Sequence, residues 1–256
     1  MAHSLEIKPL KLHRAARVLH KPDLVIGVPG LQIHKNRLIA DTASRVVVFP
    51  AFHKGGAGCR TNGKAEFEDE VARQMTVVML YGGGGKDAVG GTLARVLSGF
   101  GGVQYYNGSQ LIVPEKGKQA RFYLYETDVI PRESNAEGIF ILKNNLPSGA
   151  GGVLPEGFIP VLDAQNLRAA ALLKGTKNIA LTCGTSVKDT LSVASLDYTN
   201  AVISLQRGLV TLSGELLEPH DIKVLLQSPI GVFPLLACCA VLLLAGEPSA
   251  DGYFFR

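Results

Sequence analysis

Two short segments of this sequence combine residues that could bind an anion or move a proton, and both follow one pattern. Each has a glycine, three further residues and then Lys-Asp, directly after an apolar run. The first copy ends at Lys86-Asp87 and the second at Lys188-Asp189, and no other Lys-Asp dipeptide occurs in the chain. Backbone N–H groups gather where a buried strand turns on a glycine, and α/β proteins place anion sites there. The pattern therefore predicts two anion-binding turns.

The first copy is a run of four glycines followed by a charged pair. We expect Gly82, Gly83, Gly84 and Gly85 to let a ligand approach the backbone. Lys86 would hold the negative charge of the ligand, and Asp87 would orient it or move a proton. A Walker A loop needs Ser or Thr after its lysine, and Asp87 stands there instead, so we do not predict an NTPase. The alternative is a plain tight turn in which Asp87 caps a helix.

The second copy carries more reactive side chains. We expect Gly184, Thr185 and Ser186 to bind the ligand, and Lys188 and Asp189 to act as Lys86 and Asp87 do. Cys183 would be a nucleophile if a helix N-terminus lowered the pKa of its thiol. Two observations favour the alternative of a small buried thiol: no partner base is near in sequence, and residues 190–196 show no helical stripe.

Charge is distributed unevenly along the chain. Residues 1–64 hold eleven Lys and Arg against three acids, a net charge of +8, and the remaining residues hold 15 bases against 19 acids, a net charge of −4. A basic quarter is typical of proteins that meet nucleic acid, a phosphorylated ligand or an acidic protein surface. The protein's own acidic half would serve as the partner equally well.

Cysteine and histidine usage indicates a cytoplasmic protein without a recognisable metal site. The four cysteines form no C-x-x-C pair, and the six histidines are scattered. Zinc ligands would need closer and more regular spacing. The sequence therefore names no cofactor.

The apolar run at 224–246 has two interpretations. Its length is close to what a bilayer requires, which would make it a C-terminal membrane anchor. Pro229 and Pro234 divide it, however, and a helix at 221–227 followed by a buried helix at 233–245 explains it as well. We favour the buried helix of a soluble core.

The spacing of apolar residues predicts alternating strands and helices. In the first part we expect strands at 45–49 and 76–81, helices at 65–73 and 87–100, a hairpin turning at Asn107-Gly108, and strands at 121–126 and 138–143. In the second part we expect a strand at 158–162, a helix capped by Asp163 and ending at 173, a strand at 178–182, and a hairpin at 202–205 and 209–212.

The fold class that follows is α/β, a mixed β-sheet with helices, arranged as two related lobes. The Pro-Ser-Gly-Ala-Gly-Gly segment at 147–152 marks the boundary between a basic lobe at 1–146, which contains a Gly-rich loop, and an α/β lobe at 153–256; one continuous domain is the alternative. Each Lys-Asp copy would then follow a helix and a strand, which suggests an internal repeat.

Three functions remain open at this point. We expect the chain to bind a small anionic ligand, phosphorylated or carboxylated, in a cleft between the lobes, with turnover of that ligand left open. The second hypothesis is a non-enzymatic subunit that binds nucleic acid or an acidic protein through the basic quarter. The third is a membrane-anchored protein. A homo-oligomer or a subunit of a larger complex would fit the first two.

Overall fold

The chain divides into two compact units, Met1–Ala65 and Glu66–Arg256. The computed structural model describes residues 75–83, 89–114, 119–131, 134, 136–149 and 151–256, and the backbone of two short strands in the first unit. These strands, β1 (Gln32–His34) and β2 (Arg37–Ile39), pair antiparallel. The strand expected at 45–49, the helix expected at 65–73 and most of the basic quarter lie outside the described residues.

The second unit combines a large sheet with helices. Its helices are α1 (Val89–Leu97), α2 (Leu167–Leu173) and α3 (Val232–Leu244). Its strands are β3 (Thr76–Tyr81), β4 (Gly102–Tyr106), β5 (Leu111–Ile112), β6 (Ala120–Thr127), β7 (Gly138–Leu142), β8 (Phe158–Asp163), β9 (Leu181–Gly184), β10 (Leu191–Leu196), β11 (Asn200–Leu205), β12 (Leu209–Val210), β13 (Leu216–Leu217), β14 (His220–Leu226) and β15 (Tyr253–Phe255).

Eleven strands form one sheet in the order β15-β14-β11-β10-β9-β8-β7-β3-β6-β4-β5. The seven strands from β4 to β10 in this order run parallel to their neighbours. β5, β11 and β14 pair antiparallel, and β15 returns parallel to β14. This is the mixed α/β fold that the sequence predicts.

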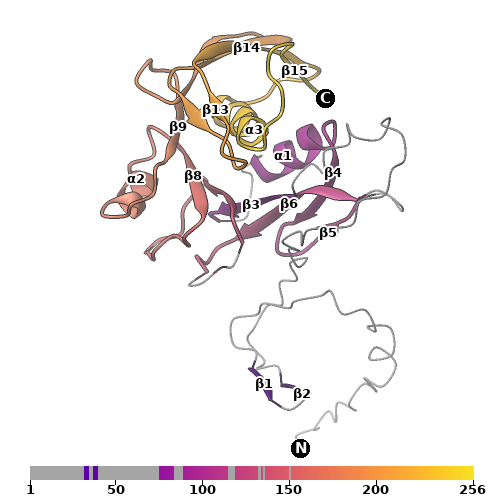
Figure 1. Ribbon diagram of the computed structural model, residues 1–256, viewed down its shortest axis with the longest axis vertical. Coiled ribbons are helices and arrows are strands. Elements are labelled where there is room, and N and C mark those ends of the chain that lie inside the picture. Colours follow the sequence, from indigo (N-terminus) through magenta and orange to yellow (C-terminus); the bar gives the residue numbers. More distant parts are fainter. Residues whose placement is uncertain are drawn as a thin grey trace, which may run out of the picture. The chain divides into compact units, whose positions relative to one another are not determined.

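Two helices cover one face of the sheet. α1 and α3 lie side by side over it (Figure 1), and their apolar side chains join those of the strands in one core. α1 buries Val89, Leu93, Val96 and Leu97, which recur at helical spacing. Because β3 and α1 are adjacent in sequence, the helix returns over the sheet to the parallel strand β4, as a βαβ unit does.

The opposite face is covered differently along the parallel strands. Val77, Met79 and Tyr81 alternate with the residues of β3 that face α1, and all of them are buried. Phe140 of β7 contacts both Tyr81 and Phe158 through their rings. The connections after β6 and β7 add the buried residues Ile130, Leu146 and Leu154.

The apolar run near the C-terminus forms a core helix. Eleven of the thirteen residues of α3 are buried, on all sides of the helix. Burying an apolar side chain contributes about 1.5–3 kcal/mol, so α3 is a main source of stability for the unit. Across the described residues, no helix is long and apolar enough to cross a membrane.

Several expected elements agree with the structure. β3 spans the residues expected, α1 lies within the helix expected at 87–100, and β8, α2 and β9 form the expected strand–helix–parallel strand unit. The hairpin at Asn107-Gly108 joins β4 to β5, where Asn107 Oδ1 accepts the N–H groups of Ser109 at 3.1 Å and Gln110 at 2.8 Å.

Three expectations are wrong. The segment at 221–227 is β14, because Ile222, Val224 and Leu226 alternate with exposed residues and bury one face of a strand. The expected hairpin does not form, since β11 pairs with β10 and β14, while β12 pairs with β13. Asp163 ends β8, and the side chain that caps α2 is Asn166, which accepts the Ala169 N–H at 3.0 Å.

The segment at 147–152 connects β7 to β8, and these two strands pair directly along their length. The sheet therefore continues without interruption across the position where the sequence suggests a lobe boundary. The two Lys-Asp copies also lead into different elements: the helix α1 follows the first, and the strand β10 follows the second.

Candidate functional site

The side of β3 on which the chain places its next parallel strands changes along the sequence. From β3 the chain moves to β4 on one side of the sheet, and from β7 it moves to β8 on the other side. Connections that diverge in this way leave a crevice at the carboxyl ends of the strands, where open α/β sheets bind their ligands. The ends of β3, β6 and β7 therefore define the candidate site.

The turn that follows β3 is tied to both neighbouring strands. The Gly82 N–H donates to the carbonyl oxygen of Thr127 at 3.1 Å, at the end of β6. The Gly83 N–H donates to the carbonyl oxygen of Asn145 at 2.9 Å, just after β7. The carbonyl oxygen of Gly83 accepts from Asn145 Nδ2 at 2.7 Å and from Lys143 Nζ at 3.1 Å. The start of the glycine run is thus fixed by residues from two other strands.

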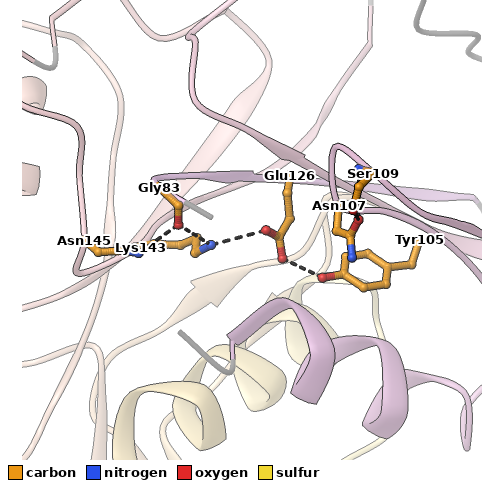
Figure 2. A network of polar contacts seen from close by, with 7 residues as sticks. All are labelled: Gly83, Tyr105, Asn107, Ser109, Glu126, Lys143 and Asn145. Carbon is orange, nitrogen blue, oxygen red and sulfur yellow. Dashed lines mark hydrogen bonds and ion pairs between the residues drawn. The ribbon is translucent and has the colours of Figure 1, made fainter. Parts of the chain in front are cut away.

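A buried ion pair lies beneath this turn (Figure 2). Lys143 Nζ is 3.3 Å from Glu126 Oε2, and the two side chains are 1% and 12% exposed. The hydroxyl of Tyr105 donates to Glu126 Oε1 at 2.6 Å. Both carboxylate oxygens of Glu126 therefore have a partner. Burial, together with the bond to Glu126, raises the pKa of Tyr105 well above its usual value, so this hydroxyl keeps its proton.

The first turn of α1 closes over this ion pair. A Cβ atom at Gly90 would overlap Glu126 Oε1 and would lie 2.6 Å from the hydroxyl of Tyr105. Only glycine leaves room there for the carboxylate. The next glycine, Gly91, is exposed and has no heavy atom within 4 Å of the position its Cβ would take. The close approach of Glu126 thus explains why position 90 is a glycine, although glycine weakens a helix.

A cavity of about 680 Å³ opens beside the same strand ends. It is lined by Tyr81 of β3, by 128–130 after β6, and by 147–149 and 151–153 after β7. Arg168 borders this region, because its guanidinium donates to the carbonyl oxygen of Pro147 at 2.6 Å. Burial and the nearby charge of Asp128 raise the pKa of Tyr81, an effect that Arg168 opposes. The cavity wall therefore combines a phenol and a carboxylate with glycine backbone, and the guanidinium of Arg168 lies behind Pro147.

The first predicted turn reaches this edge only in part. Gly82 and Gly83 lie at it, whereas Gly84, Gly85, Lys86 and Asp87 lie outside the described residues.

The second predicted turn is a separate structure at the end of β9. Asp189 is buried and its Oδ2 accepts the N–H of Ser186 at 3.0 Å, while Thr185, Ser186 and Lys188 are exposed. A Cβ atom at Gly184 would overlap the carboxylate of Asp189. Since β7 and β8 separate β9 from β3, the two turns begin roughly 14 Å apart along the sheet.

Of the two interpretations of Cys183, the structure agrees with the favoured one, a small buried thiol, and contradicts a thiol of lowered pKa. Its side chain is fully buried in the core, and burial, followed by the charges around it, raises the pKa of the thiol well above its usual value. The element that follows the turn is the strand β10, so no helix begins at this turn. A thiol in this environment stays protonated and packs as a small apolar group.

Sequence reasoning missed the residues that the structure brings together here: Tyr105, Glu126, Lys143, Asn145 and Arg168. A signal for part of this set was present, since Lys143 and two asparagines directly follow the apolar run of β7. Among the described residues, no group of three or more His, Cys, Asp or Glu side chains could hold a metal ion.

No protein-family model and no curated protein matches this sequence. Solved structures with a similar fold include a murein peptide ligase from Psychrobacter arcticus, with a TM-score of 0.38 and 12% identity over 71% of this chain and 45% of that one. MurF from Acinetobacter baumannii has a TM-score of 0.42 and 13% identity over 70% of this chain and 44% of that one. This chain thus spans less than half the length of these two enzymes. At such identities the likeness concerns the fold alone.

Proposed function

We propose that this chain binds a small anionic ligand, phosphorylated or carboxylated, at the carboxyl ends of β3, β6 and β7. The observation that carries the proposal is the cavity of about 680 Å³ at this edge, built from the last residue of β3 and from the connections after β6 and β7. Cavities of roughly 300–1,000 Å³ are typical of sites for small organic ligands. The size favours a ligand with an organic body in addition to its charged group.

Positive charge for the anion comes from the rim of the cavity. Arg168 is exposed, and one nitrogen of its guanidinium donates to the carbonyl oxygen of Pro147, so its other N–H donors can face a ligand. Lys86, in the turn that begins at Gly82, is the second cation that we assign to the ligand on the basis of the sequence. Lys143 is already engaged with Glu126 and Gly83, which makes it a support of the turn.

The second turn does not belong to this site in our proposal. A ligand that reached both turns would have to span roughly 14 Å. Asp189 is occupied by its own turn, and Cys183 is buried in the core. We therefore propose ligand binding without assigning a nucleophile. Roles in binding for Gly184, Thr185, Ser186 and Lys188 stay predictions.

Thermal unfolding of the full chain tests the proposal. The probes are inorganic phosphate, phenyl phosphate, citrate and pyrophosphate, each at up to 10 mM. A ligand at a hundred times its Kd stabilises the folded state by about 2.7 kcal/mol, which corresponds to a rise in Tm of roughly 5–10 °C for a unit of this size. If none of the probes raises Tm, the proposal is wrong.

A pair of valine variants locates the site. Val153 lines the cavity and Val187 lies in the second turn, and their side chains are 76% and 77% exposed. Because both are exposed, Val153→Trp and Val187→Trp should leave the fold equally intact. We expect Val153→Trp to fill the cavity and abolish the ligand-induced rise in Tm, and Val187→Trp to retain it. The reverse result would place the ligand at the second turn.

Two lysine variants test the charge. Lys86→Ala should reduce the ligand-induced rise in Tm, whereas Lys188→Ala should leave it unchanged. Loss of the rise in Lys188→Ala alone would contradict the assignment.

A further inference from the structure

A serine and a histidine from distant parts of the sequence meet at the start of β14, a strand that five others separate from β3 in the sheet. His220 Nε2 lies 2.7 Å from Ser249 Oγ, and His220 Nδ1 lies 2.7 Å from the carbonyl oxygen of Glu218. Both side chains are half-buried, so solvent and small molecules can reach them. Both ring nitrogens of His220 therefore have a partner.

The contact with Glu218 determines the tautomer of the imidazole. A carbonyl oxygen can only accept a hydrogen bond, so His220 Nδ1 must carry a proton and donate it. In the neutral ring Nε2 is then an acceptor, and the hydroxyl of Ser249 donates to it. A hydroxyl that is bonded to an imidazole, which is itself held by a third group, is the arrangement that activates a serine as a nucleophile.

The backbone holds both residues in place. His220 and Ser249 each directly follow a Glu-Pro dipeptide, and the proline fixes one backbone torsion angle next to the functional residue. The N–H of Glu247 donates to the carbonyl oxygen of Leu242 at 2.9 Å, which ties this segment to the end of α3. The carbonyl oxygen of Glu247 accepts from the hydroxyl of the buried Tyr253 at 3.1 Å. The pair thus stands on anchored backbone.

The turn that begins at Ser249 offers hydrogen-bond donors for a negatively charged oxygen. The Gly252 N–H donates to the carbonyl oxygen of Ser249 at 3.0 Å and closes a β-turn. A serine at the first position of a turn can bond the N–H two residues on, so that N–H lies on the side of its hydroxyl. Within the part of the chain that the structure describes, the N–H groups of Ala250 and Asp251 have no hydrogen-bond partner.

We propose that Ser249 and His220 form a nucleophile–base pair that hydrolyses small neutral or cationic esters, independently of the ligand site at β3, β6 and β7. His220 Nε2 takes the hydroxyl proton while Ser249 Oγ bonds to the carbonyl carbon of the ester. The ester C–O bond then breaks, and the leaving alcohol takes the proton from Nε2. Water, deprotonated by the same nitrogen, then attacks the acyl group. The carboxylic acid departs, and Ser249 regains its proton from His220.

The charge around the pair disfavours anionic esters. Three exposed acids lie within two residues of His220 or Ser249, whereas Lys223 is the nearest basic residue in sequence; the acids are Glu218, Asp221 and Asp251. A fourth acid, Glu247, is already paired with Arg121. Because like charges repel, a neutral or cationic ester should react faster than an anionic one, by about threefold or more.

Diisopropyl fluorophosphate, which reacts with activated serines, tests the nucleophile. We expect it to label Ser249 in the folded full chain, as located by peptide mass mapping. Ser204, whose hydroxyl donates to Asp221 Oδ1 at 2.5 Å, should stay unlabelled. His220→Gln keeps a group that can bond to Ser249 but removes the base, so the labelling rate should fall by about a hundredfold or more. In the matched control, Ser204→Ala, Ser249 should be labelled at the wild-type rate.

Hydrolysis of three esters tests the reaction itself. Wild-type protein should hydrolyse p-nitrophenyl acetate and acetylthiocholine faster than the anionic p-nitrophenyl hemisuccinate, and Ser249→Ala should lose this activity. Thermal unfolding of Ser249→Ala with phenyl phosphate is a separate control. The ligand-induced rise in Tm should match that of the wild type, because the pair lies outside the cavity lining.

Several results would overturn the inference: no labelling of Ser249, labelling that is unchanged in His220→Gln, or hydrolysis that persists in Ser249→Ala. Each would mean that the contact only ties the turn to β14. A protein that is labelled at Ser249 but hydrolyses none of the esters would overturn the reaction. Should His220→Gln fail to fold, the comparison of wild type with Ser249→Ala, which lacks one oxygen atom, still decides. None of these results affects the proposed ligand site.

Discussion

Two carboxylates in this molecule lie against a glycine, and their surroundings differ in origin. Glu126 meets Gly90, and its partners Tyr105 and Lys143 come from β4 and from the end of β7. Asp189 meets Gly184, and its partner is the N–H of Ser186, three residues away. The first arrangement joins three strands and a helix, whereas the second closes a single turn.

This difference shows that similar sequence at two positions need not produce similar sites. Both Lys-Asp copies follow a buried strand of the parallel sheet, yet only the first lies where the connections diverge and leave a cavity. The second leads directly into the strand β10. Position in the sheet, more than local sequence, determines which turn can take a ligand.

The largest expected effect is the difference in stability between substitutions at two adjacent glycines of α1. Gly90→Ala would displace Glu126 from Lys143 and should lower the free energy of unfolding by about 2–4 kcal/mol. Gly91→Ala meets no atom and should raise it by up to about 1 kcal/mol, since alanine favours the helix. Denaturant titration measures both. Equal effects of the two substitutions would mean that Glu126 is not held against α1.

A smaller effect is expected at the second turn. Asp189→Ala removes the acceptor of the Ser186 N–H and should lower the free energy of unfolding by about 1–3 kcal/mol. Asp189→Asn keeps an acceptor oxygen and should cost less than half as much. Ligand-induced stabilisation should persist in both variants, and its loss would show that the two turns share one site.

Cys183 offers a chemical test of the same contrast. Because burial raises the pKa of its thiol, we expect no alkylation by iodoacetamide in the folded protein at pH 8 over an hour, and full alkylation in guanidinium chloride. Peptide mass mapping measures this residue individually. Labelling of folded Cys183 faster than a free thiol would restore it as a nucleophile and make the second turn the reactive one.

The smallest effect concerns Asp197, in the turn between β10 and β11. The N–H groups of Thr199 and Asn200 hold the pKa of this carboxyl below its usual value. A folded pKa below the unfolded one adds stability above about pH 4, which is lost as the pH falls through the folded pKa. Asp197→Asn should flatten the stability profile below pH 4 and leave ligand binding unchanged. An identical profile in the variant would contradict this assignment.

Sequence patterns were sufficient where local periodicity decides the structure. The stripe Val89, Leu93, Val96 predicted α1, and Asn107-Gly108 predicted the hairpin between β4 and β5. At 221–227 the sequence does carry the alternation of Ile222, Val224 and Leu226, but dividing the apolar run at its prolines assigns this segment to a helix.

The ion pair could not be predicted in the same way. Glu126 and Lys143 are 17 residues apart in sequence, and they meet only because β3 lies between β6 and β7 in the sheet. Strand order depends on how the whole sheet assembles, so no local pattern contains it. The sequence signal was partial: Lys143 and two asparagines directly follow the apolar run of β7, but no local pattern pairs Lys143 with Glu126.

The most direct test of the account is amide hydrogen exchange of the full chain with and without 10 mM phenyl phosphate. We predict that the ligand slows exchange at 82–83, 128–130 and 145–153, and leaves 184–189 unchanged. Protection confined to 184–189, or absent from both regions at a concentration that raises Tm, would contradict the placement of the ligand at the ends of β3, β6 and β7.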